Sequence, residues 1–416
     1  MPARVGLLHY TCPPVIGGVE TILYEQAARL AARGYPVTVL SGRGGPLADD
    51  AIVLRLIPEL DSRHPDVTAV RERLLRGDVP PAFATLRHRI QEELDRIVRD
   101  VDVLIVHNAL TLHFNLPLTA ALWSIASRPA PRVISWIHDL SWVNPLYRHW
   151  MHDGEPWDLL RRSNPRIAPV FVSRQRLDEW RELTGATVDE TQVIPNGIDA
   201  AALMRLGPTS RALAARFALL DADVVMLAPV RITRRKNLEW AIEAAAGVRD
   251  AGHRVRLLIT GPPGPHDPRS MEYVAELKQL TARLGLDHVV VFLFDALASS
   301  RPAGSTGYAV DSETLSELYM LSDVVVLPSA SEGFGLPLAE AAIFRTPVVC
   351  TDLPAFKELA PQGATVVPLA SGSAGFARAV QEAIDAPVAR LRRHVLDALS
   401  WDRLIRERIE PLLAKP

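Results

Sequence analysis

Cysteine is nearly absent from this sequence of 416 residues, in which only Cys12 and Cys350 occur, far apart in the chain. Such a pair excludes the disulfide framework of small secreted proteins and favours a reducing compartment. The sequence also lacks any apolar stretch close to the roughly 18 to 20 residues that a membrane span needs. The apolar run at the N-terminus is too short for a signal peptide. We therefore expect a cytoplasmic protein with no transmembrane segment, and peripheral membrane contact stays open.

An excess of charge of one sign is also missing. The chain has 46 basic and 48 acidic residues and a formal net charge of −2, which gives no electrostatic reason to expect a nucleic acid partner. Lysine is scarce, so Lys236 in a basic loop is less apt to be incidental. A phosphorylase dependent on pyridoxal phosphate would need a Schiff-base lysine, and none is clearly placed for it. The lysines are Lys236, Lys278, Lys357 and Lys415.

Short apolar runs alternate with helical patterns along the whole chain, which is typical of parallel α/β sheets. A chain of this length favours two domains. In the first half we predict a helix at Glu20–Arg33 and strands at Val5–Tyr10, Val37–Ser41, Val103–His107, Val133–His138 and Val170–Ser173. In the second half we predict strands at Val224–Val230, Val255–Gly261, Val289–Phe294, Val324–Ser329 and Pro347–Thr351.

The break between the halves falls at the turn residues of Ile194–Asp199. The sequence therefore predicts an α/β fold with two Rossmann-like, doubly wound parallel-sheet domains and a cleft between them. Residues 1–198 would form the first domain and 199–390 the second. Residues 391–416 read as an amphipathic helical segment that we expect to pack back on the first domain.

Adjacent glycines, Gly17 and Gly18, lie in the turn between the first strand and the first helix. Their exposed amides could cradle an anion such as a phosphate. A dinucleotide-binding turn is the alternative, but the spacing is not G-x-G-x-x-G. The second strand also ends without the acidic residue that would meet a ribose. An ordinary glycine-rich turn is the third reading.

A basic loop, Val230–Asn237, follows the first strand of the second half. Arg231 and Lys236 lie at the two ends of its charged part and can converge on one anion. Cleavage of a nucleotide sugar leaves a diphosphate, and fixed cations would stabilise the charge that develops on it. Arg234 and Arg235 more simply face solvent.

The segment Ser331–Glu340 carries the strongest pattern, because it follows a strand and opens a helix. Pro337 suits the first helical turn, and the glycines at 333 and 335 let the loop approach a ligand. Glu340 lies about one turn into the helix and can face the same side as the loop. Its alanine neighbours predict that Glu340 is buried, and a buried carboxylate needs partners such as ribose hydroxyls.

Three histidines, His9, His107 and His138, each end a predicted strand of the first half, so they can line one site. Polar contacts with an acceptor molecule are the preferred interpretation. A metal site of three histidines is the alternative, and we expect no metal. Trp142 could stack on an acceptor sugar or belong to the core.

Together these patterns resemble the large GT4 family of retaining glycosyltransferases with the GT-B fold. The resemblance rests on Glu332 and Glu340 with seven residues between them, on the loop from Arg231 to Asn237, on Pro195–Asp199, and on Gly17–Glu20. The motifs occur in the family's order and cover essentially the whole chain. Each motif alone is weak, but the set is specific.

The resemblance implies roles for individual residues. Arg231 and Lys236 would hold the donor diphosphate, Glu332 would contact the donor sugar beside the amides of Phe334, Gly335 and Leu336, and Glu340 would bind the ribose. Gly17 and Gly18 would close on phosphate and acceptor. His138 matches the family's active-site histidine. The stretch Gly261–His266 suits a rigid loop near the nucleotide base. Family members work without a bound metal.

The resulting hypothesis is metal-independent transfer of a hexose from a nucleotide diphosphate sugar to an acceptor hydroxyl with retention of configuration. UDP-glucose and GDP-mannose are both reasonable donors, and the acceptor would be a small molecule or a glycan. No side chain is an obvious covalent nucleophile, which favours front-face displacement. A sugar-nucleotide epimerase of GT-B fold and a non-catalytic module that binds sugar nucleotides are the alternatives.

Overall fold

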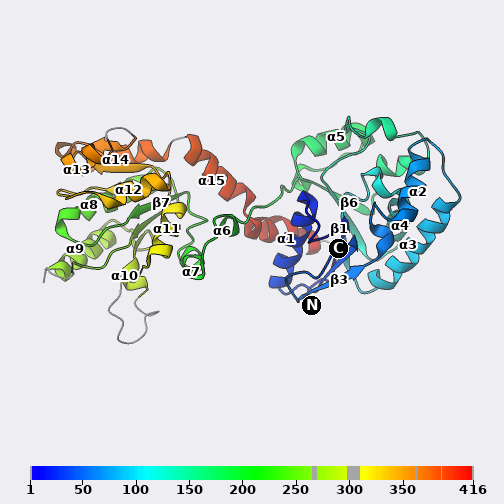
Figure 1. Ribbon diagram of the computed structural model, residues 1–416, viewed down its shortest axis with the longest axis horizontal. Coiled ribbons are helices and arrows are strands. Elements are labelled where there is room, and N and C mark those ends of the chain that lie inside the picture. Colours follow the sequence, from blue (N-terminus) through cyan, green and yellow to red (C-terminus); the bar gives the residue numbers. More distant parts are fainter. Residues whose placement is uncertain (1, 265–268, 298–309, 361–362, 386, 415–416) are drawn as a thin grey trace. The chain divides into compact units, whose positions relative to one another are not determined.

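The computed structural model describes residues 2–264, 269–297, 310–360, 363–385 and 387–414. They form two compact units, which Figure 1 draws in the colours of the sequence. Unit 1 consists of Met1–Gly197 and Trp401–Pro416, and unit 2 of Ile198–Ser400. The junction lies one residue before the predicted boundary. The predicted segment 391–416 is divided, because its first part belongs to helix α15 (Pro387–Leu399) of unit 2.

Unit 1 contains a six-stranded sheet in the order β3-β2-β1-β4-β5-β6. All neighbouring strands are parallel, so their carboxyl ends lie at one edge. The chain order reverses between β1 and β4, and open α/β sheets bind ligands outside such a switch point. The strands are β1 (Val5–Thr11), β2 (Val37–Arg43), β3 (Ile52–Leu56), β4 (Val103–His107), β5 (Arg132–Ile137) and β6 (Ile167–Phe171).

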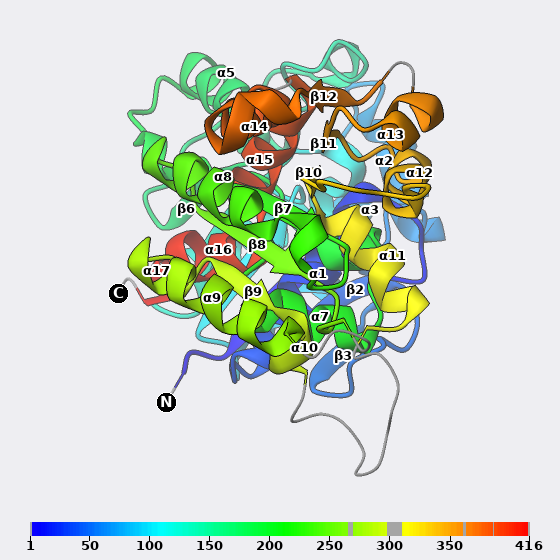
Figure 2. The same ribbon diagram turned by 90° about the vertical axis from the view of Figure 1, so that its left-hand side faces the viewer.

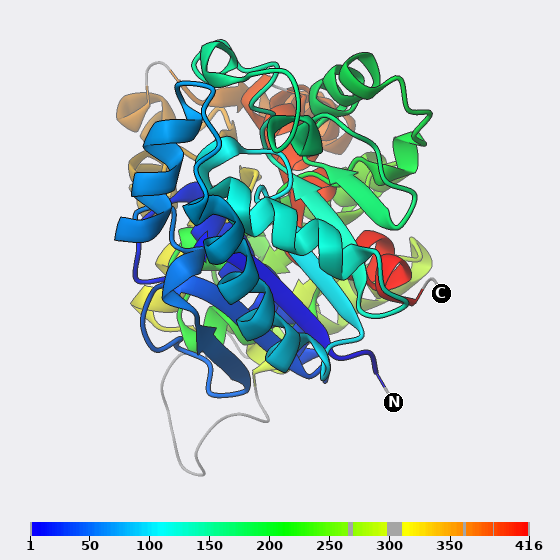
Figure 3. The ribbon, with the colours of Figure 1, turned by 90° about the vertical axis from the view of Figure 1, so that its right-hand side faces the viewer.

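Helices cover both faces of this sheet because its side chains are apolar on both sides. One face packs on α2, α3 and α4, and α3 buries Leu86, Ile90 and Leu94 at helical spacing. The other face packs on α1 and on the C-terminal segment that begins at Trp401. Figure 3 is turned so that this unit faces the viewer. The helices are α1 (Gly18–Ala32), α2 (Pro65–Leu74), α3 (Ala82–Val98), α4 (Leu116–Ala126), α5 (Arg174–Thr184), α16 (Trp401–Leu404) and α17 (Glu410–Ala414). Shorter turns are η1 (Pro58–Leu60), η2 (His113–Asn115), η3 (Arg148–Trp150), η4 (Trp157–Leu160), η5 (Glu190–Gln192) and the π-helical η9 (Ile405–Ile409).

The sheet of unit 2 repeats this topology in the order β12-β11-β10-β7-β8-β9, again with parallel neighbours throughout. Its switch point lies between β7 and β10. The strands are β7 (Val224–Ala228), β8 (Val255–Ile259), β9 (Val290–Phe292), β10 (Val324–Leu327), β11 (Val348–Thr351) and β12 (Thr365–Val367).

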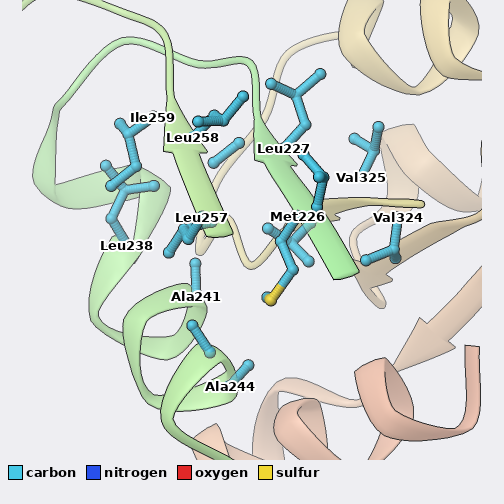
Figure 4. Close-up of a cluster of buried hydrophobic side chains, with 14 of the residues drawn as sticks. Met226, Leu227, Leu238, Ala241, Ala244, Leu257, Leu258, Ile259, Val324 and Val325 are labelled. Carbon is cyan, nitrogen blue, oxygen red and sulfur yellow. The ribbon is translucent and has the colours of Figure 1, made fainter. Parts of the chain in front are cut away.

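Small side chains let helix α8 lie close to this sheet. Figure 4 shows Leu238, Ala241 and Ala244 of α8 on the side that faces β7 and β8, and all three are buried. Helix α14 lies beside α8, as Figures 1 and 2 both show. The helices are α6 (Ala200–Leu203), α7 (Pro208–Arg216), α8 (Leu238–Asp250), α9 (Ser270–Arg283), α10 (Leu293–Ala296), α11 (Ser312–Leu321), α12 (Leu336–Ile343), α13 (Pro354–Leu359), α14 (Gly372–Ile384) and α15. Short turns are η6 (Arg234–Lys236) and η8 (Leu369–Ser371).

The predicted pair of Rossmann-like sheets is confirmed, and each predicted strand is present with its ends at most three residues from the predicted ones. Two edge strands, β3 and β12, were not predicted. β3 is mostly exposed and β12 has only three residues, so neither shows a buried apolar run. Among the helices of the described ranges, none has the length and apolar character to cross a membrane.

Candidate active site

The basic loop after β7 and the loop after β10 meet in unit 2, because these two strands are neighbours. Lys236 of η6 and Glu332 of the second loop form an ion pair between Nζ and Oε2. The two side chains are only 7% and 11% exposed. The guanidinium of Arg235 lies 3.5 Å from the same Oε2 atom and donates to the carbonyl of Ser331 at 3.1 Å. Two residues predicted for separate donor contacts are therefore partners of one another.

Burial dominates the electrostatics of this pair. It lowers the pKa of Lys236, while the carboxylate of Glu332 raises that pKa and the cation of Arg235 lowers it further. A buried ammonium needs an anionic partner, and Glu332 fills that place. A ligand phosphate is, like the carboxylate, an anion with oxygen acceptors, so Lys236 can hold either group.

Arg231 follows β7 and Gly261 follows β8, and the backbones of the two residues lie against each other. The N–H of Gly261 donates to the carbonyl of Val230 at 3.1 Å. A Cβ atom at position 261 would lie 2.2 Å from that carbonyl oxygen and 2.5 Å from the Cα atom of Arg231. Only glycine allows this contact, which fixes the start of the basic loop. Pro265 and His266 of the predicted base loop lie outside the described residues.

Arg234 is exposed, as the sequence predicts, and forms a two-point ion pair with Glu276 at 2.8 and 2.6 Å. This pair accounts for Arg234 without a ligand. It also makes Arg234 a useful reference for the buried Lys236 in the same turn.

The loop that opens helix α12 depends on Gly335. Its φ is +97°, and an added Cβ atom would lie 2.8 Å from the ring of Phe356. Nothing lies within 4 Å of the corresponding position at Gly333. The side chains of Phe334 and Leu336 are 59% and 61% exposed, so the loop is accessible to a ligand.

The prediction that Glu340 is buried is wrong, because its side chain lies at the partly exposed side of α12. The alanine after it is buried, but Ala342 and Ile343 are exposed. Glu340 does have a partner: the hydroxyl of Tyr319 on α11 donates to its Oε2 atom at 2.6 Å. Burial and this carboxylate raise the pKa of Tyr319 well above its usual range.

In unit 1 the three predicted histidines come together at the carboxyl ends of the adjacent strands β1, β4 and β5. His9 Nδ1 lies 3.0 Å from the carbonyl oxygen of His107. His107 Nδ1 lies 3.1 Å from His138 Nε2. Burial lowers the pKa of all three, that of His138 to about 3. Neutral imidazoles can orient hydroxyl groups by hydrogen bonds, which suits the predicted contacts with an acceptor.

The described residues contain no group of three histidine, cysteine, aspartate or glutamate side chains arranged to hold a metal ion. In the histidine cluster, His107 Nδ1 and His138 Nε2 are engaged with each other, and His9 Nδ1 with a backbone carbonyl.

Glu20 fills the space beside Gly17, the residue before helix α1. A Cβ atom at position 17 would lie 2.0 Å from Glu20 Oε2, whereas nothing lies within 4 Å at Gly18. Glu20 Oε1 accepts from the hydroxyl of Thr11 at 2.5 Å and lies 3.9 Å from His9 Nε2. The turn thus links the glycines to the histidine cluster, with Gly18 as its open position.

Trp142 makes contacts typical of a structural residue. Its indole N–H donates to the carbonyl of Trp157 at 3.1 Å, and the guanidinium of Arg161 lies 3.9 Å from its ring centroid. These contacts occupy one face and the polar edge of the ring. They account for Trp142 without an acceptor sugar.

Two further residues position the site and were not predicted. Asn108 has φ of +60°, and its Oδ1 atom accepts from the backbone N–H of His138 at 2.9 Å. Tyr319 holds Glu340 from a helix 21 residues away in sequence. No local pattern marks either residue. Asn108 follows the strand-ending His107 directly, and that proximity is the one signal that could have found it.

Known proteins resemble this chain in both of its units. A family model described as Glycosyltransferase Family 4 matches residues 16–202, and one described as Glycosyl transferases group 1 matches residues 222–386. The D-inositol 3-phosphate glycosyltransferase of Saccharomonospora viridis is 36% identical and aligns over 84% of this chain and 78% of its own. The enzyme of that name from Geodermatophilus obscurus is 26% identical over 97% and 88%. Glycogen synthase of Mycobacterium tuberculosis is 26% identical over 94% and 88%. The chain therefore belongs to glycosyltransferase family 4, and its two Rossmann-like units are those of the GT-B fold.

Proposed function

We propose that this glycosyltransferase moves a hexose, glucose or mannose, from a nucleotide diphosphate sugar to an acceptor hydroxyl with retention of configuration. The observation that carries the proposal is the buried pair of Lys236 and Glu332 at the switch point of unit 2. A cation held in place there can stabilise a departing diphosphate without reorganisation. Arg231, at the start of the same loop, would share that charge without a metal ion.

Each residue of the donor site has a distinct part in the proposal. The diphosphate would take over the contact between Lys236 and Glu332, which frees the carboxylate of Glu332 for hydroxyls of the sugar. The amides of Phe334, Gly335 and Leu336 would lie along the same sugar or phosphate. Glu340, already oriented by Tyr319, would accept from the ribose hydroxyls.

The transfer step would be a front-face displacement. The acceptor oxygen bonds to the anomeric carbon, the bond from that carbon to the diphosphate oxygen breaks, and the acceptor's proton passes to the departing diphosphate. His138 would orient or polarise a hydroxyl rather than attack. The lowered pKa of His138 supports this part, because a neutral imidazole donates one hydrogen bond without adding a charge.

The relatives suggest where to begin with substrates. Two of them are named for D-inositol 3-phosphate and one for glycogen. A phosphorylated polyol and a glucan are therefore the first acceptors to test, with UDP-glucose and GDP-mannose as donors. The two buried free cysteines agree with a reducing compartment such as the cytoplasm.

The decisive experiment measures nucleotide release with donor alone and then with donor plus each acceptor. Transfer requires release that depends on the acceptor, and proton NMR of the product should show the α-anomer of the donor preserved. Product from donor alone would favour an epimerase. A thermal shift with nucleotide sugars but no turnover with any acceptor would favour a binding module. An inverted anomer would contradict the retaining mechanism.

A further inference from the structure

His107 is the centre of the histidine cluster and contacts both other members through different atoms. Its backbone carbonyl meets His9 Nδ1 at 3.0 Å, and its own Nδ1 meets His138 Nε2 at 3.1 Å. The side chain of His107 is completely buried, whereas that of His138 is partly exposed. His9 is also buried, at 6% exposed, so within this cluster His138 is the member placed to reach a substrate.

The proton on His9 follows from its partner. A carbonyl oxygen can only accept a hydrogen bond, so Nδ1 of His9 carries a proton. Burial lowers the pKa of His9, which leaves the ring neutral with a bare Nε2. The backbone of His107 thus selects the tautomer of one neighbour.

The side chain of His107 bears on the tautomer of His138. Burial lowers the pKa of both rings, so at neutral pH each carries one proton. A hydrogen bond between two such nitrogens needs one N–H and one lone pair. Either His107 donates from Nδ1 and His138 keeps its proton on Nδ1, or His138 donates from Nε2 and keeps Nδ1 bare.

The other nitrogen of His107 distinguishes these arrangements. Its Nε2 atom is buried and has no hydrogen-bond partner within the part of the chain that the structure describes. In the first arrangement this atom is a bare acceptor, and in the second it is an N–H donor without an acceptor. Among buried backbone groups, an N–H without a partner is rarer than an acceptor without one, and we extend that preference to this ring.

We infer that His107 is a positioning residue that donates from Nδ1 to Nε2 of His138 and thereby fixes the proton of His138 on Nδ1. His138 then presents a hydrogen-bond donor to the substrate. The consequence for turnover rests on the proposed function, since it assumes that His138 contacts a reacting sugar or acceptor. The tautomer itself depends on no assumption about the substrate.

Nitrogen-15 NMR of the full-length protein labelled at histidine tests the tautomer directly. The imidazole shifts should show a protonated Nδ1 and a bare Nε2 on His138 at neutral pH. A His138→Gln variant identifies the signals. A protonated Nε2 on His138 in the wild-type protein would overturn the inference, whatever the variants below do.

Two variants at position 107 test the cause. His107→Asn keeps an N–H donor near the place of Nδ1, while His107→Leu removes it at similar bulk. Asn should retain the wild-type tautomer of His138, and Leu should release a mixture of tautomers. His113→Asn is the matched control, because His113 is also buried but bonds to Ser141 Oγ at 2.8 Å. An unchanged tautomer in a folded His107→Leu protein would contradict a positioning role. If neither variant folds, the wild-type spectrum still decides the proton's position.

Turnover provides the second measurement. His107→Leu should lower kcat about tenfold with the donor KM unchanged, as expected for one lost hydrogen bond. His107→Asn should retain most of the wild-type kcat. Equal losses for Leu and Asn would contradict the inference, since only the first lacks the donor. Absence of transfer by the wild-type protein with every donor would instead overturn the proposed function and leave the NMR result to stand alone.

Discussion

At the scale of single residues, the pairing of Lys236 with Glu332 means that the cation is held ready by an internal anion before any substrate arrives. The pair also explains how a lysine can be nearly buried beyond the carboxyl end of a central strand. Under the proposed function, a donor phosphate would compete with this carboxylate, so the two residues would act as a unit. Variants at either position should therefore affect donor binding and turnover together.

Replacing Lys236 with alanine should lower kcat by about 10²-fold or more, because it removes a fixed cation from the departing diphosphate. Steady-state kinetics with a saturating donor measures this loss. Arg234→Ala is the matched control from the same turn, since Arg234 is exposed and pairs with Glu276. Near-normal turnover in a folded Lys236→Ala protein, or an equal loss in Arg234→Ala, would remove Lys236 from the leaving-group site.

Tyr319→Phe tests how Glu340 is oriented. The variant loses the hydroxyl that donates to Glu340 but keeps the ring, which stacks on Phe344 at 5.4 Å between centroids. We expect the donor KM to rise about fivefold to tenfold at nearly constant kcat, the effect of losing an orienting hydrogen bond worth about 1–1.4 kcal/mol. Titration with the free nucleotide should show the same loss. An unchanged nucleotide affinity would show that Tyr319 does not prepare Glu340 for the ribose.

At the scale of elements, buried strands were predictable and their partners were not. Runs such as Val103–His107 reveal a central strand because both of its faces are buried. β3 is exposed at an edge, and the same logic cannot find it. The sequence identified Lys236 and Glu332 singly. Their contact depends on β7 lying beside β10, a pairing set by the whole sheet rather than by either segment. Glu340 was misjudged because neighbouring alanines do not report which side of a helix meets the core.

The turn before α12 offers a pair of glycines for comparison. Gly335→Ala should destabilise unit 2 by about 1–3 kcal/mol, because φ of +97° is strained for alanine and the new methyl group would meet Phe356. Gly333→Ala should be nearly neutral, since its Cβ atom would enter open space. Urea denaturation of the two variants measures the difference. Equal stabilities would mean that the turn does not need the left-handed conformation.

At the scale of the whole molecule, unit 1 carries four buried or partly buried histidines that make its stability depend on pH. Burial lowers the pKa of His9 and His107, that of His138 to about 3 and that of His113 to about 4. In the unfolded chain a histidine takes up a proton near pH 6.5. The unfolded state therefore binds more protons below that pH, and the free energy of unfolding falls as the pH decreases.

We expect the urea midpoint of unit 1 to decrease between pH 7 and pH 5, with each such histidine contributing up to about 1.4 kcal/mol per pH unit below 6.5. The range stops at pH 5 because carboxylates begin to titrate below it. His113→Asn should make the pH dependence shallower by one proton. A midpoint independent of pH over this range would mean that these rings take up protons equally in the folded and unfolded states.

The division into two units predicts two unfolding events with separate causes. Trp401 is 2% exposed in the core of unit 1, and its ring lies against Gly197, where a Cβ atom would be 2.2 Å from Cδ2. Trp401→Ala should lower the free energy of unfolding of unit 1 by about 3–5 kcal/mol, the usual cost of such a cavity. UDP or GDP at about 100 times its Kd should raise the free energy of unfolding of unit 2 by about 2.7 kcal/mol.

Differential scanning calorimetry of the full chain separates these effects, because the mutation and the nucleotide act on different cores. Leu391→Ala is the control for the mutation, since Leu391 is 64% exposed on α15 and belongs to unit 2. If two transitions are seen, Trp401→Ala should lower the temperature of the unit 1 transition only, and the nucleotide should raise that of the unit 2 transition only. If the mutation and the nucleotide shift a single common transition, the two units unfold together, and the C-terminal segment then stabilises the donor site as well as the sheet on which it packs.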